Sequence, residues 1–348
     1  MVEIGTIRSV AMAPILDNMS VESVSLWILI PLFNEESTLA SLQARIDLFA
    51  NTLKMRVNII YIDDGSTDRS WAAIRECARK NNKVYGLKLS RNFGKEVAMS
   101  AGLDFLARRN DVDCAIIMDA DLQDPPELIP QMVDLWRAGN DTVYATRRRR
   151  DGESVLKKVT ARIFYRVLGW ISSVSIPRDT GDFRLISQRA IRAIASLPER
   201  QRYMKGIFAW IGFPLAQIFY DREARISGNT KFNFLRLWRL AVEGITSFST
   251  VPLRIASWVG LSASMFAVFY GLWIVCKVLI WGIAVPGYAS LMVVILILAG
   301  LQLSALGIIG EYVGRTYIES KSRPLYFVSE IVGFGLNAKQ FDASGQVC

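Results

Sequence analysis

The chain has 348 residues, with 41 Lys and Arg against 32 Asp and Glu, and it contains no histidine. The absence of histidine excludes His-liganded zinc, Ser–His or Cys–His catalytic pairs and imidazole acid–base chemistry. Hydrophobic residues make up 51% of the chain, which favours a membrane-associated protein over a disordered one. The four cysteines are scattered without paired spacing, which favours a reducing compartment over a disulfide framework: Cys77, Cys114, Cys276 and Cys348.

The first two thirds of the chain alternate β-rich apolar runs with segments of helical periodicity. The helical pattern is clear over Ser37–Leu53 and Trp71–Lys80. This alternation predicts an α/β fold, a parallel sheet covered by helices on both faces, with ligands bound at the carboxyl ends of the strands. The predicted strands are Leu26–Ile30, Val57–Ile62, Val84–Leu89, Cys114–Met118 and Thr142–Ala145.

Acidic residues follow several of these strands. Asp119 and Asp121 leave the run CAIIM, and in an extended chain residues two apart point the same way, so both can converge on one Mg²⁺ or Mn²⁺ ion. Gln123 faces the same side if the chain stays extended. The alternative is that these acids cap the next helix, but Asp124, followed by Pro125, is the better N-cap candidate.

A second acidic pair, Asp63-Asp64, follows another predicted strand and precedes Gly65-Ser66. A carboxylate at this place can accept hydrogen bonds from a nucleobase N–H or from ribose hydroxyls. The same residue types are also ordinary turn chemistry. The two interpretations are equally open from the residues alone.

Two long uncharged runs, Ile255–Cys276 and Tyr288–Gly310, follow near the C-terminal end. At about 1.5 Å per residue each can cross a hydrocarbon core of roughly 30 Å, although a pair of buried core helices is the alternative. Basic residues flank the pair on its outer sides, which predicts two spans with both termini cytoplasmic. The spacing of Gly310 and Gly314 is a weak indication of helix association, hence of a homo-oligomer.

Several other segments can contact a membrane. The four arginines Arg147–Arg150 follow a predicted strand and suit an anionic lipid head group; no recognised nucleic-acid-binding module accompanies them, so we expect no nucleic-acid partner. Phe232–Thr250 is predicted to be an interfacial helix, and for Val155–Ile176 a core helix with a charged face is favoured.

After the second apolar run, the short apolar segment Leu325–Val328 could return as a strand against the catalytic domain or a neighbour.

The order of several motifs resembles a family 2 glycosyltransferase with the GT-A fold. The motifs are ILIPLFNEE, YIDDGSTD, LSRNFGKE, MDADLQDPPELI, YATRR and DTGDFRL. With LPERQRYMKG, DREARISGNTKFN and the two apolar runs, the chain is most similar to the bactoprenol (undecaprenyl-phosphate) glucosyltransferases of the polyprenyl-phosphate branch. The resemblance extends from about Leu26 to Ser329.

The resemblance implies roles for residues in these motifs. Catalytic roles fall to Asp121 and Asp182, and metal ligation to Asp119, Asp121 and Gln123. Phe33 stands where the family often has Tyr, so a contact that needs the hydroxyl is absent here. The implied nucleotide-sugar-binding residues are Pro31, Phe33, Glu35, Asp64, Lys95, Asp119 and Ala120, and those implied for the acceptor phosphate are Arg147, Arg162, Arg222, Arg225 and Lys231.

We therefore expect a metal-dependent, inverting transfer of a hexose, with UDP-glucose favoured, to polyprenyl phosphate at the cytoplasmic membrane face. One alternative is a processive polysaccharide synthase, which usually carries a Gln-x-x-Arg-Trp motif that this sequence lacks. Another is a non-catalytic membrane scaffold with a nucleotide-binding domain.

The expected architecture is a GT-A, Rossmann-like, mostly parallel sheet flanked by helices and followed by a transmembrane helical hairpin. A loose N-terminal extension (1–23) precedes the catalytic domain (24–230). A juxtamembrane helix (231–254), two transmembrane helices within 255–312 (about 255–278 and 288–312) and a cytoplasmic tail (313–348) follow.

Overall fold

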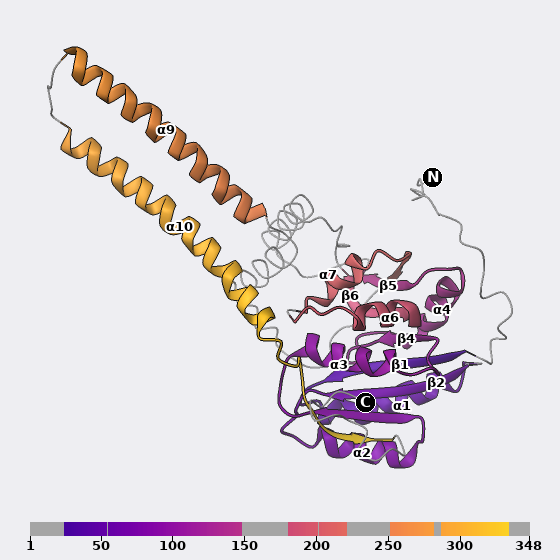
Figure 1. Cartoon of the computed structure of the whole chain (residues 1–348). Helices are drawn as coiled ribbons and strands as arrows, with labels where there is room; N and C mark the ends of the chain where they lie inside the picture. Colours follow the sequence, from indigo (N-terminus) through magenta and orange to yellow (C-terminus); the bar gives the residue numbers. More distant parts are fainter. Residues whose placement is uncertain are drawn as a thin grey trace.

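A computed structural model of the chain describes residues 24–53, 55–147, 180–200, 202–220, 251–281 and 287–333. These residues form an α/β domain from which a long helical hairpin projects (Figure 1). The expected extension 1–23, the juxtamembrane helix over 231–250 and the segment Val155–Ile176 lie outside the described residues.

The centre of the domain is an eight-stranded sheet with the order β7-β5-β6-β4-β1-β2-β3-β8. Strands β1, β2, β3 and β4 run parallel and β5 pairs in parallel with β7, whereas β6 is antiparallel to both β4 and β5. The sheet is mostly parallel, as expected from the sequence. The strands are β1 (Ser25–Leu32), β2 (Arg56–Asp63), β3 (Val84–Leu89), β4 (Cys114–Ile117), β5 (Thr142–Arg147), β6 (Thr180–Ser187), β7 (Leu215–Tyr220) and β8 (Val328–Val332).

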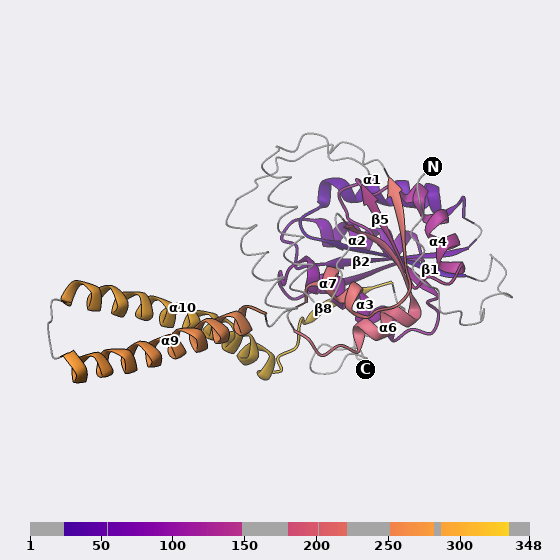
Figure 2. The ribbon, with the colours of Figure 1, turned by 90° about the horizontal axis from the view of Figure 1, so that it is seen from above.

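Helices cover both faces of this sheet because the central strands are apolar on both sides. In β1, Leu26, Ile28 and Ile30 pack with α1 (Glu36–Ala50), α2 (Ser70–Lys80) and α4 (Ile129–Arg137). Trp27 and Leu29 face the other way, toward α3 (Lys95–Ala107), α6 (Gln188–Ala195) and α7 (Met204–Trp210). The two layers are seen on opposite sides of the sheet in Figure 2. A strand buried on both faces is a continuous apolar run, which is why these strands could be predicted.

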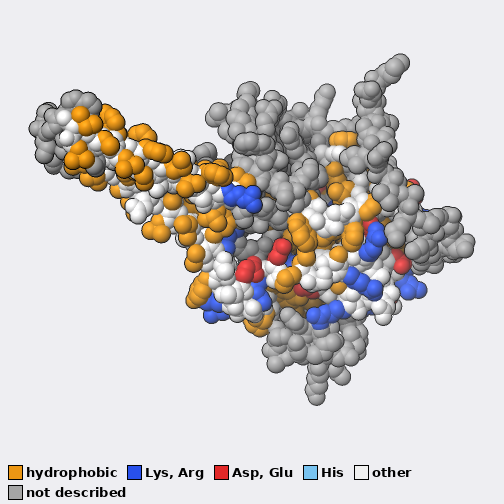
Figure 3. All heavy atoms as spheres, turned by 45° about the horizontal axis from the view of Figure 1, so that its top comes forward, with side chains coloured by type: hydrophobic (Ala, Val, Ile, Leu, Met, Phe, Trp, Pro, Cys, Tyr) orange, Lys and Arg blue, Asp and Glu red, His pale blue; other side chains and the backbone are white. Residues whose placement is uncertain are grey.

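The projecting hairpin consists of α9 (Val251–Trp281) and α10 (Tyr288–Ser320). Within them, Leu253–Ile274 and Val293–Ser320 are long and apolar enough to cross a membrane, and none of either apolar window is buried inside the protein. Figure 3 shows apolar side chains along the hairpin and basic side chains where it meets the domain. The alternative of two buried core helices does not hold among the described residues, because neither apolar window is buried by them.

After α10 the chain returns to the domain. Strand β8 pairs antiparallel with β3: Gly86 lies opposite Val332 and Leu89 opposite Val328, with a register shift between Lys88 and Leu89. The return strand expected over Leu325–Val328 thus lies a few residues later, and it lies against the catalytic domain.

Candidate active site

The candidate site lies at one edge of the sheet, which we call the carboxyl edge. Strands β1 to β5 end there, and β6 begins there because it runs antiparallel to β4 and β5. This topology brings together loops from distant parts of the sequence. Among the predicted site residues, Pro31, Phe33, Glu35, Asp64, Lys95, Asp119, Ala120, Asp121, Gln123 and Asp182 belong to this edge and its loops.

The loop after β1 is locked against the loop after β2. Asn34 adopts a positive φ of 55°, a conformation that asparagine tolerates better than most residues. Its side-chain oxygen accepts a hydrogen bond from the backbone N–H of Thr67 at 2.9 Å, and its own N–H donates to the hydroxyl of Ser66 at 2.9 Å. The Glu35 N–H donates to the hydroxyl of Ser70, also at 2.9 Å. Pro31 is buried at the end of β1, and Phe33 is 41% exposed beyond it.

Asp64 is buried and anchors a neighbouring loop. Its two carboxylate oxygens accept hydrogen bonds from the backbone N–H groups of Phe93 (2.7 Å) and Gly94 (2.8 Å), just before α3. Burial raises the pKa of Asp64, and these two hydrogen bonds oppose the rise. Gly65 next to it has φ 70°, and a Cβ there would lie 2.4 Å from the carbonyl carbon of Arg91. Of the two interpretations left open for this pair, loop chemistry is observed; direct contact with a base remains a prediction.

Lys95 is the central cation of the site. Its ammonium group lies 2.6 Å from Oδ1 of Asp119 and also contacts Oδ2 of Asp182. Burial would lower the pKa of Lys95, but the two carboxylates raise it above its ordinary value, so the side chain is charged at neutral pH. Lys95 therefore joins the acid that follows β4 to the acid near the start of β6.

Lys205, which the sequence motifs did not single out by role, reaches the same carboxylate from α7. Its ammonium lies 3.8 Å from Oδ1 of Asp182. Burial would raise the pKa of Asp182, but Lys95 and Lys205 outweigh it, and the net pKa lies below its ordinary value. Asp182 is therefore an ionised carboxylate held between two ammonium groups.

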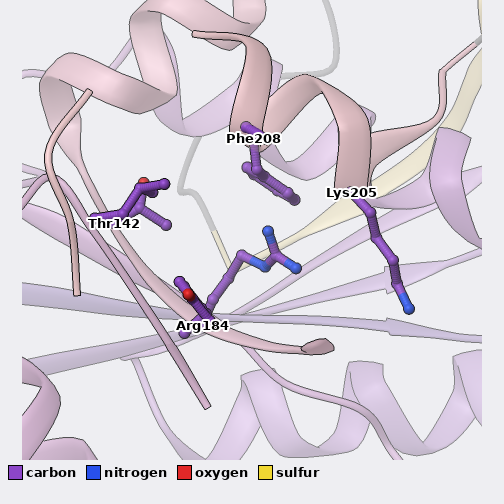
Figure 4. Close-up of a pocket in the computed structure, with 7 residues that line it drawn as sticks. Thr142, Arg184, Lys205 and Phe208 are labelled. Carbon is purple, nitrogen blue, oxygen red and sulfur yellow. The ribbon is translucent and has the colours of Figure 1, made fainter. Parts of the chain in front are cut away.

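Two further charged groups support this arrangement from behind. Glu96 accepts a hydrogen bond from the backbone N–H of Met204 at 3.1 Å, which ties the start of α7 to the start of α3. Arg184 is buried, and its burial lowers its pKa to about 10, so it stays cationic at neutral pH. Its guanidinium carbon lies 4.0 Å from the centre of the Phe208 ring. Figure 4 shows Arg184 reaching from β6 toward Phe208, while Lys205 leaves α7 in another direction.

The loop after β4 differs from its prediction. Leu122 has φ 61°, so the chain turns after Asp121 and is not extended. Asp124 was expected to cap a helix, but its carboxylate accepts the backbone N–H of Asp119 at 3.0 Å, and the next helical turn, Pro126–Leu128, begins with Pro125 at its cap position. Asp124 therefore fixes the position of Asp119. A tight turn needs hydrogen bonds within its own loop. This explains why the Asp124 carboxylate accepts the Asp119 N–H, whereas the sequence predicted a helix cap.

The donor atoms of this loop suit a hard divalent cation. Asp119 and Asp121 offer carboxylates, and burial, with Asp182 and Asp121 nearby, raises the pKa of Asp119 despite the opposing effect of Lys95. Oε1 of Gln123 is buried and has no hydrogen-bond partner among the described residues. Among the described residues, no group of three or more acidic or cysteine side chains is assembled for a metal. The turn at Leu122 removes the extended geometry expected for Gln123, and only the donor types of the three residues suit an oxygen-ligand ion, which would take its other ligands from a bound substrate and water.

The predicted acceptor-phosphate residues are only partly described. Arg147 ends β5 at the carboxyl edge, in register with Tyr220 of β7. Arg162, Arg222, Arg225 and Lys231 lie outside the described residues. The described cations nearest Asp182 are instead Lys95 and Lys205.

The chain matches the family described as Glycosyl transferase family 2 over residues 27–195. It is 48% identical to "Uncharacterized glycosyltransferase sll0501" of Synechocystis sp., over 89% of this chain and 96% of that protein. It is 43% identical to "Prophage bactoprenol glucosyl transferase homolog" of Escherichia coli, over 87% of this chain and 98% of that protein. It is 42% identical to "Bactoprenol glucosyl transferase" of Shigella phage SfV, over 86% of this chain and 97% of that protein.

The mostly parallel mixed sheet with helices on both faces is that of the GT-A fold, and the family match makes the chain a glycosyltransferase. The chain belongs to glycosyl transferase family 2, and its homologues include bactoprenol glucosyl transferases.

Proposed function

We propose that this glycosyltransferase moves glucose from UDP-glucose to a polyprenyl phosphate, undecaprenyl phosphate, with inversion at the sugar. The observation that carries the proposal is the cluster of Lys95, Asp119, Asp182 and Lys205 at the carboxyl edge. The names of the bactoprenol glucosyl transferase relatives support the choice of acceptor and of glucose. The helical hairpin would hold the catalytic domain at the membrane, where the lipid acceptor lies.

The charges of the cluster suit a reaction between two phosphate-bearing substrates. Transfer from a nucleotide sugar builds negative charge on the departing diphosphate, and fixed cations nearby stabilise that charge. Lys95 and Lys205 are ammonium groups already placed around Asp182. A bound Mg²⁺ or Mn²⁺, held by Asp119, Asp121 and Gln123, would supply further positive charge to the diphosphate.

Asp182 suits the orientation of the acceptor better than the removal of a proton. A phosphate acceptor is anionic at neutral pH and can attack without a strong base. The lowered pKa of Asp182, caused by Lys95 and Lys205 acting against burial, makes this carboxylate a weak proton acceptor. We propose that Asp182 positions Lys95 and Lys205 and the attacking phosphate, and that Asp182→Asn lowers the rate without removing a limb of the pH–rate profile.

The hairpin supports the membrane part of the proposal. Two helices that are exposed, apolar and long enough to cross a bilayer need a lipid environment, and the polyprenyl acceptor resides in one. Basic residues before α9 and after α10 favour a cytoplasmic location for the catalytic domain and both termini. The protein would therefore take its nucleotide sugar from the cytoplasm.

The proposal is tested with the full chain in lipid vesicles that contain undecaprenyl phosphate. Labelled UDP-glucose and Mg²⁺ are added, and the lipid is extracted into organic solvent. We expect label in the lipid phase, lost on addition of EDTA and restored by excess Mg²⁺ or Mn²⁺. Folded protein that transfers no sugar from a panel of UDP and GDP hexoses would contradict the proposal and favour a membrane scaffold. Label in a long polymer would favour a processive synthase.

A further inference from the structure

The C-terminal end of α10 is connected to the loop that precedes α7. Both carboxylate oxygens of Glu319, in the last turn of α10, accept the backbone N–H of Arg200, at 2.9 and 3.2 Å. Arg200 lies between α6 and α7, far from α10 in sequence. The bond therefore links the helix that carries the apolar span to the loop that leads into the active site.

Glu319 stands at a helix position that is electrostatically unfavourable for a carboxylate, although the basic Lys321 follows at the C-cap. The C-terminal end of a helix carries a partial negative charge, which disfavours a carboxylate in the last turn and favours a basic residue. The last turn of α10 contains no basic residue and does contain Glu319. The hydrogen bond to Arg200 offsets this unfavourable electrostatic interaction.

The loop that Glu319 holds leads directly to the reacting groups. Arg202 in this loop donates to the carbonyl oxygens of Ile194 (3.2 Å) and Leu197 (2.8 Å), so the loop is also tied to the end of α6. Two residues later the Met204 N–H donates to Glu96, and Lys205 then extends toward Asp182. Arg200 is thus five positions before the ammonium group that contacts the catalytic carboxylate.

The end of α10 is itself fixed to the domain, so it can act as a rigid support. Just after the helix, the hydroxyl of Tyr326 donates to Asp104 on α3 at 3.1 Å, and β8 then pairs with β3. In Figure 1, α10 meets the domain at this end and the chain continues to the sheet. The end of α10 that carries Glu319 is therefore fixed to the domain by several contacts.

We propose that Glu319 is a positioning residue of the transferase. Through its hydrogen bond to the N–H of Arg200, Glu319 fixes the position of the start of α7 and so places Lys205 near Asp182. This positioning requires that α10 be docked on the domain. The membrane helix would then contribute to turnover as well as to anchoring. The inference rests on the proposed function, because Lys205 and Asp182 are assigned to the reaction there.

The test compares Glu319→Ala and Glu319→Gln with Glu311→Ala in the full chain in vesicles. Glu311 is the matched control, since it lies on the same helix and its half-exposed side chain pairs with Arg315, one turn further along α10, at 3.0 Å. We expect Glu319→Ala to lower kcat about tenfold, the scale of one charge-assisted hydrogen bond, with KM for the nucleotide sugar within about twofold. Glu319→Gln keeps an acceptor oxygen and should recover part of the loss, and Glu311→Ala should match the wild type.

A double-mutant cycle with Lys205→Ala separates positioning from a general structural effect. If Glu319 acts through Lys205, Glu319→Ala costs little in a chain that already lacks the Lys205 ammonium. Equal losses in both backgrounds would overturn the proposal, and so would a Glu319→Ala enzyme that behaves like Glu311→Ala. The Tm of each variant is measured, and Glu319→Gln carries the test if the alanine variant does not fold.

A second measurement does not depend on turnover. Hydrogen exchange at the amides of residues 200–205 should accelerate in Glu319→Ala and stay unchanged in Glu311→Ala. Unchanged exchange would overturn the inference even in an active enzyme. If the wild type transfers no sugar, but its amides at residues 200–205 still exchange more slowly than those of Glu319→Ala, the result counts against the proposed function alone.

Discussion

The carboxyl edge has two halves, and the acidic side chains of the two halves have different partners. In the loops after β1, β2 and β3, which we call the nucleotide half, the acids accept hydrogen bonds from backbone N–H groups. Asp63 accepts from Ser66, and Asp64 accepts from Phe93 and Gly94. Beyond β4, in the reaction half, Asp124 still accepts a backbone N–H, but Asp119 and Asp182 face the ammonium groups of Lys95 and Lys205.

Under the proposed function, the difference separates residues that hold the shape of the site from residues proposed to take part in the reaction. A backbone N–H cannot leave a carboxylate without a rearrangement of its loop, so the nucleotide half is preorganised. An ammonium on a long side chain can shift toward an incoming phosphate at small cost, because a partly exposed ion pair contributes little to stability. Substitutions in the nucleotide half should therefore lower stability, and substitutions in the reaction half should lower the rate.

The largest expected effect is the loss of activity in Lys95→Met. The substitution removes the cation shared by Asp119 and Asp182, and we expect kcat to fall by about 10²–10³, the usual cost of removing one group that stabilises transition-state charge. The change in Tm should be small. The measurement is lipid-linked transfer at saturating substrates, together with thermal unfolding.

Lys80→Met is the matched control for Lys95→Met. Lys80 also pairs with a carboxylate, Glu76 at 3.1 Å, but on the exposed surface of α2. Its substitution should leave both kcat and Tm unchanged. If Lys95→Met unfolds the protein but retains the rate per folded molecule, the reaction half is a structural element and the comparison fails.

The sequence predicted the carboxyl edge well because strand ends determine it. The apolar runs located β1 to β5, and the parallel arrangement of β1 to β4 then brought Asn34, Asp64, Lys95 and Asp119 to one edge. The apolar length of the two C-terminal runs likewise predicted α9 and α10. These features depend on hydrophobic periodicity, which is local in the sequence.

Contacts between distant segments could not be predicted in the same way. The turn at Leu122 and the bond from Asp119 N–H to Asp124 depend on the geometry of a short loop, which residue type alone does not fix. The approach of Lys205 to Asp182 depends on the antiparallel placement of β6. Lys205 lies in the motif LPERQRYMKG, but no spacing rule connects that motif to Lys95.

The next largest effect should be a loss of stability in Asp64→Asn. An amide has one acceptor oxygen, so it can hold only one of the two N–H groups of Phe93 and Gly94 and turns its own N–H₂ toward the other. A buried N–H left without a partner costs about 1–3 kcal/mol. We expect denaturant unfolding to show a loss of this size and KM for the nucleotide sugar to rise.

Asp68→Asn is a suitable control in the same loop, since its carboxylate accepts at an exposed site from the N–H of Glu36 at 3.2 Å. It should be much milder than Asp64→Asn. A large fall in kcat for Asp64→Asn with normal stability would instead assign Asp64 to substrate and weaken the distinction between the halves.

A smaller effect, about 1–2 kcal/mol, is expected for Asn34→Ala. Alanine loses the acceptor for the Thr67 N–H and is also strained at a φ of 55°. Asn34→Gly loses the same acceptor but adopts a positive φ without strain. The difference in unfolding free energy between the two variants therefore measures the backbone strain. Equal losses would show that the side-chain bond alone holds the turn.

The smallest effect is expected for Glu96→Gln, which lies behind the reaction half and still offers an oxygen to the Met204 N–H. Burial, together with the nearby Asp182, raises the pKa of Glu96 above 4.5 despite Met204, Lys205 and Lys95. An acid whose pKa is raised on folding destabilises the fold once it is ionised, so wild-type stability falls as the pH rises from about 4.5 through the raised pKa.

Glu96→Gln removes this contribution. Its unfolding free energy should therefore exceed that of the wild type by an amount that grows over the same pH range and stays below about 1 kcal/mol. Denaturant unfolding at pH 4 to 8 gives the difference between the two proteins, with Glu76→Gln, an exposed partner of Lys80, as the control. A difference that shrinks as the pH rises would mean that Lys95 and Lys205 overcompensate the burial of Glu96. Glu96 would then belong with the ion pairs of the reaction half rather than with the acids that fix loops.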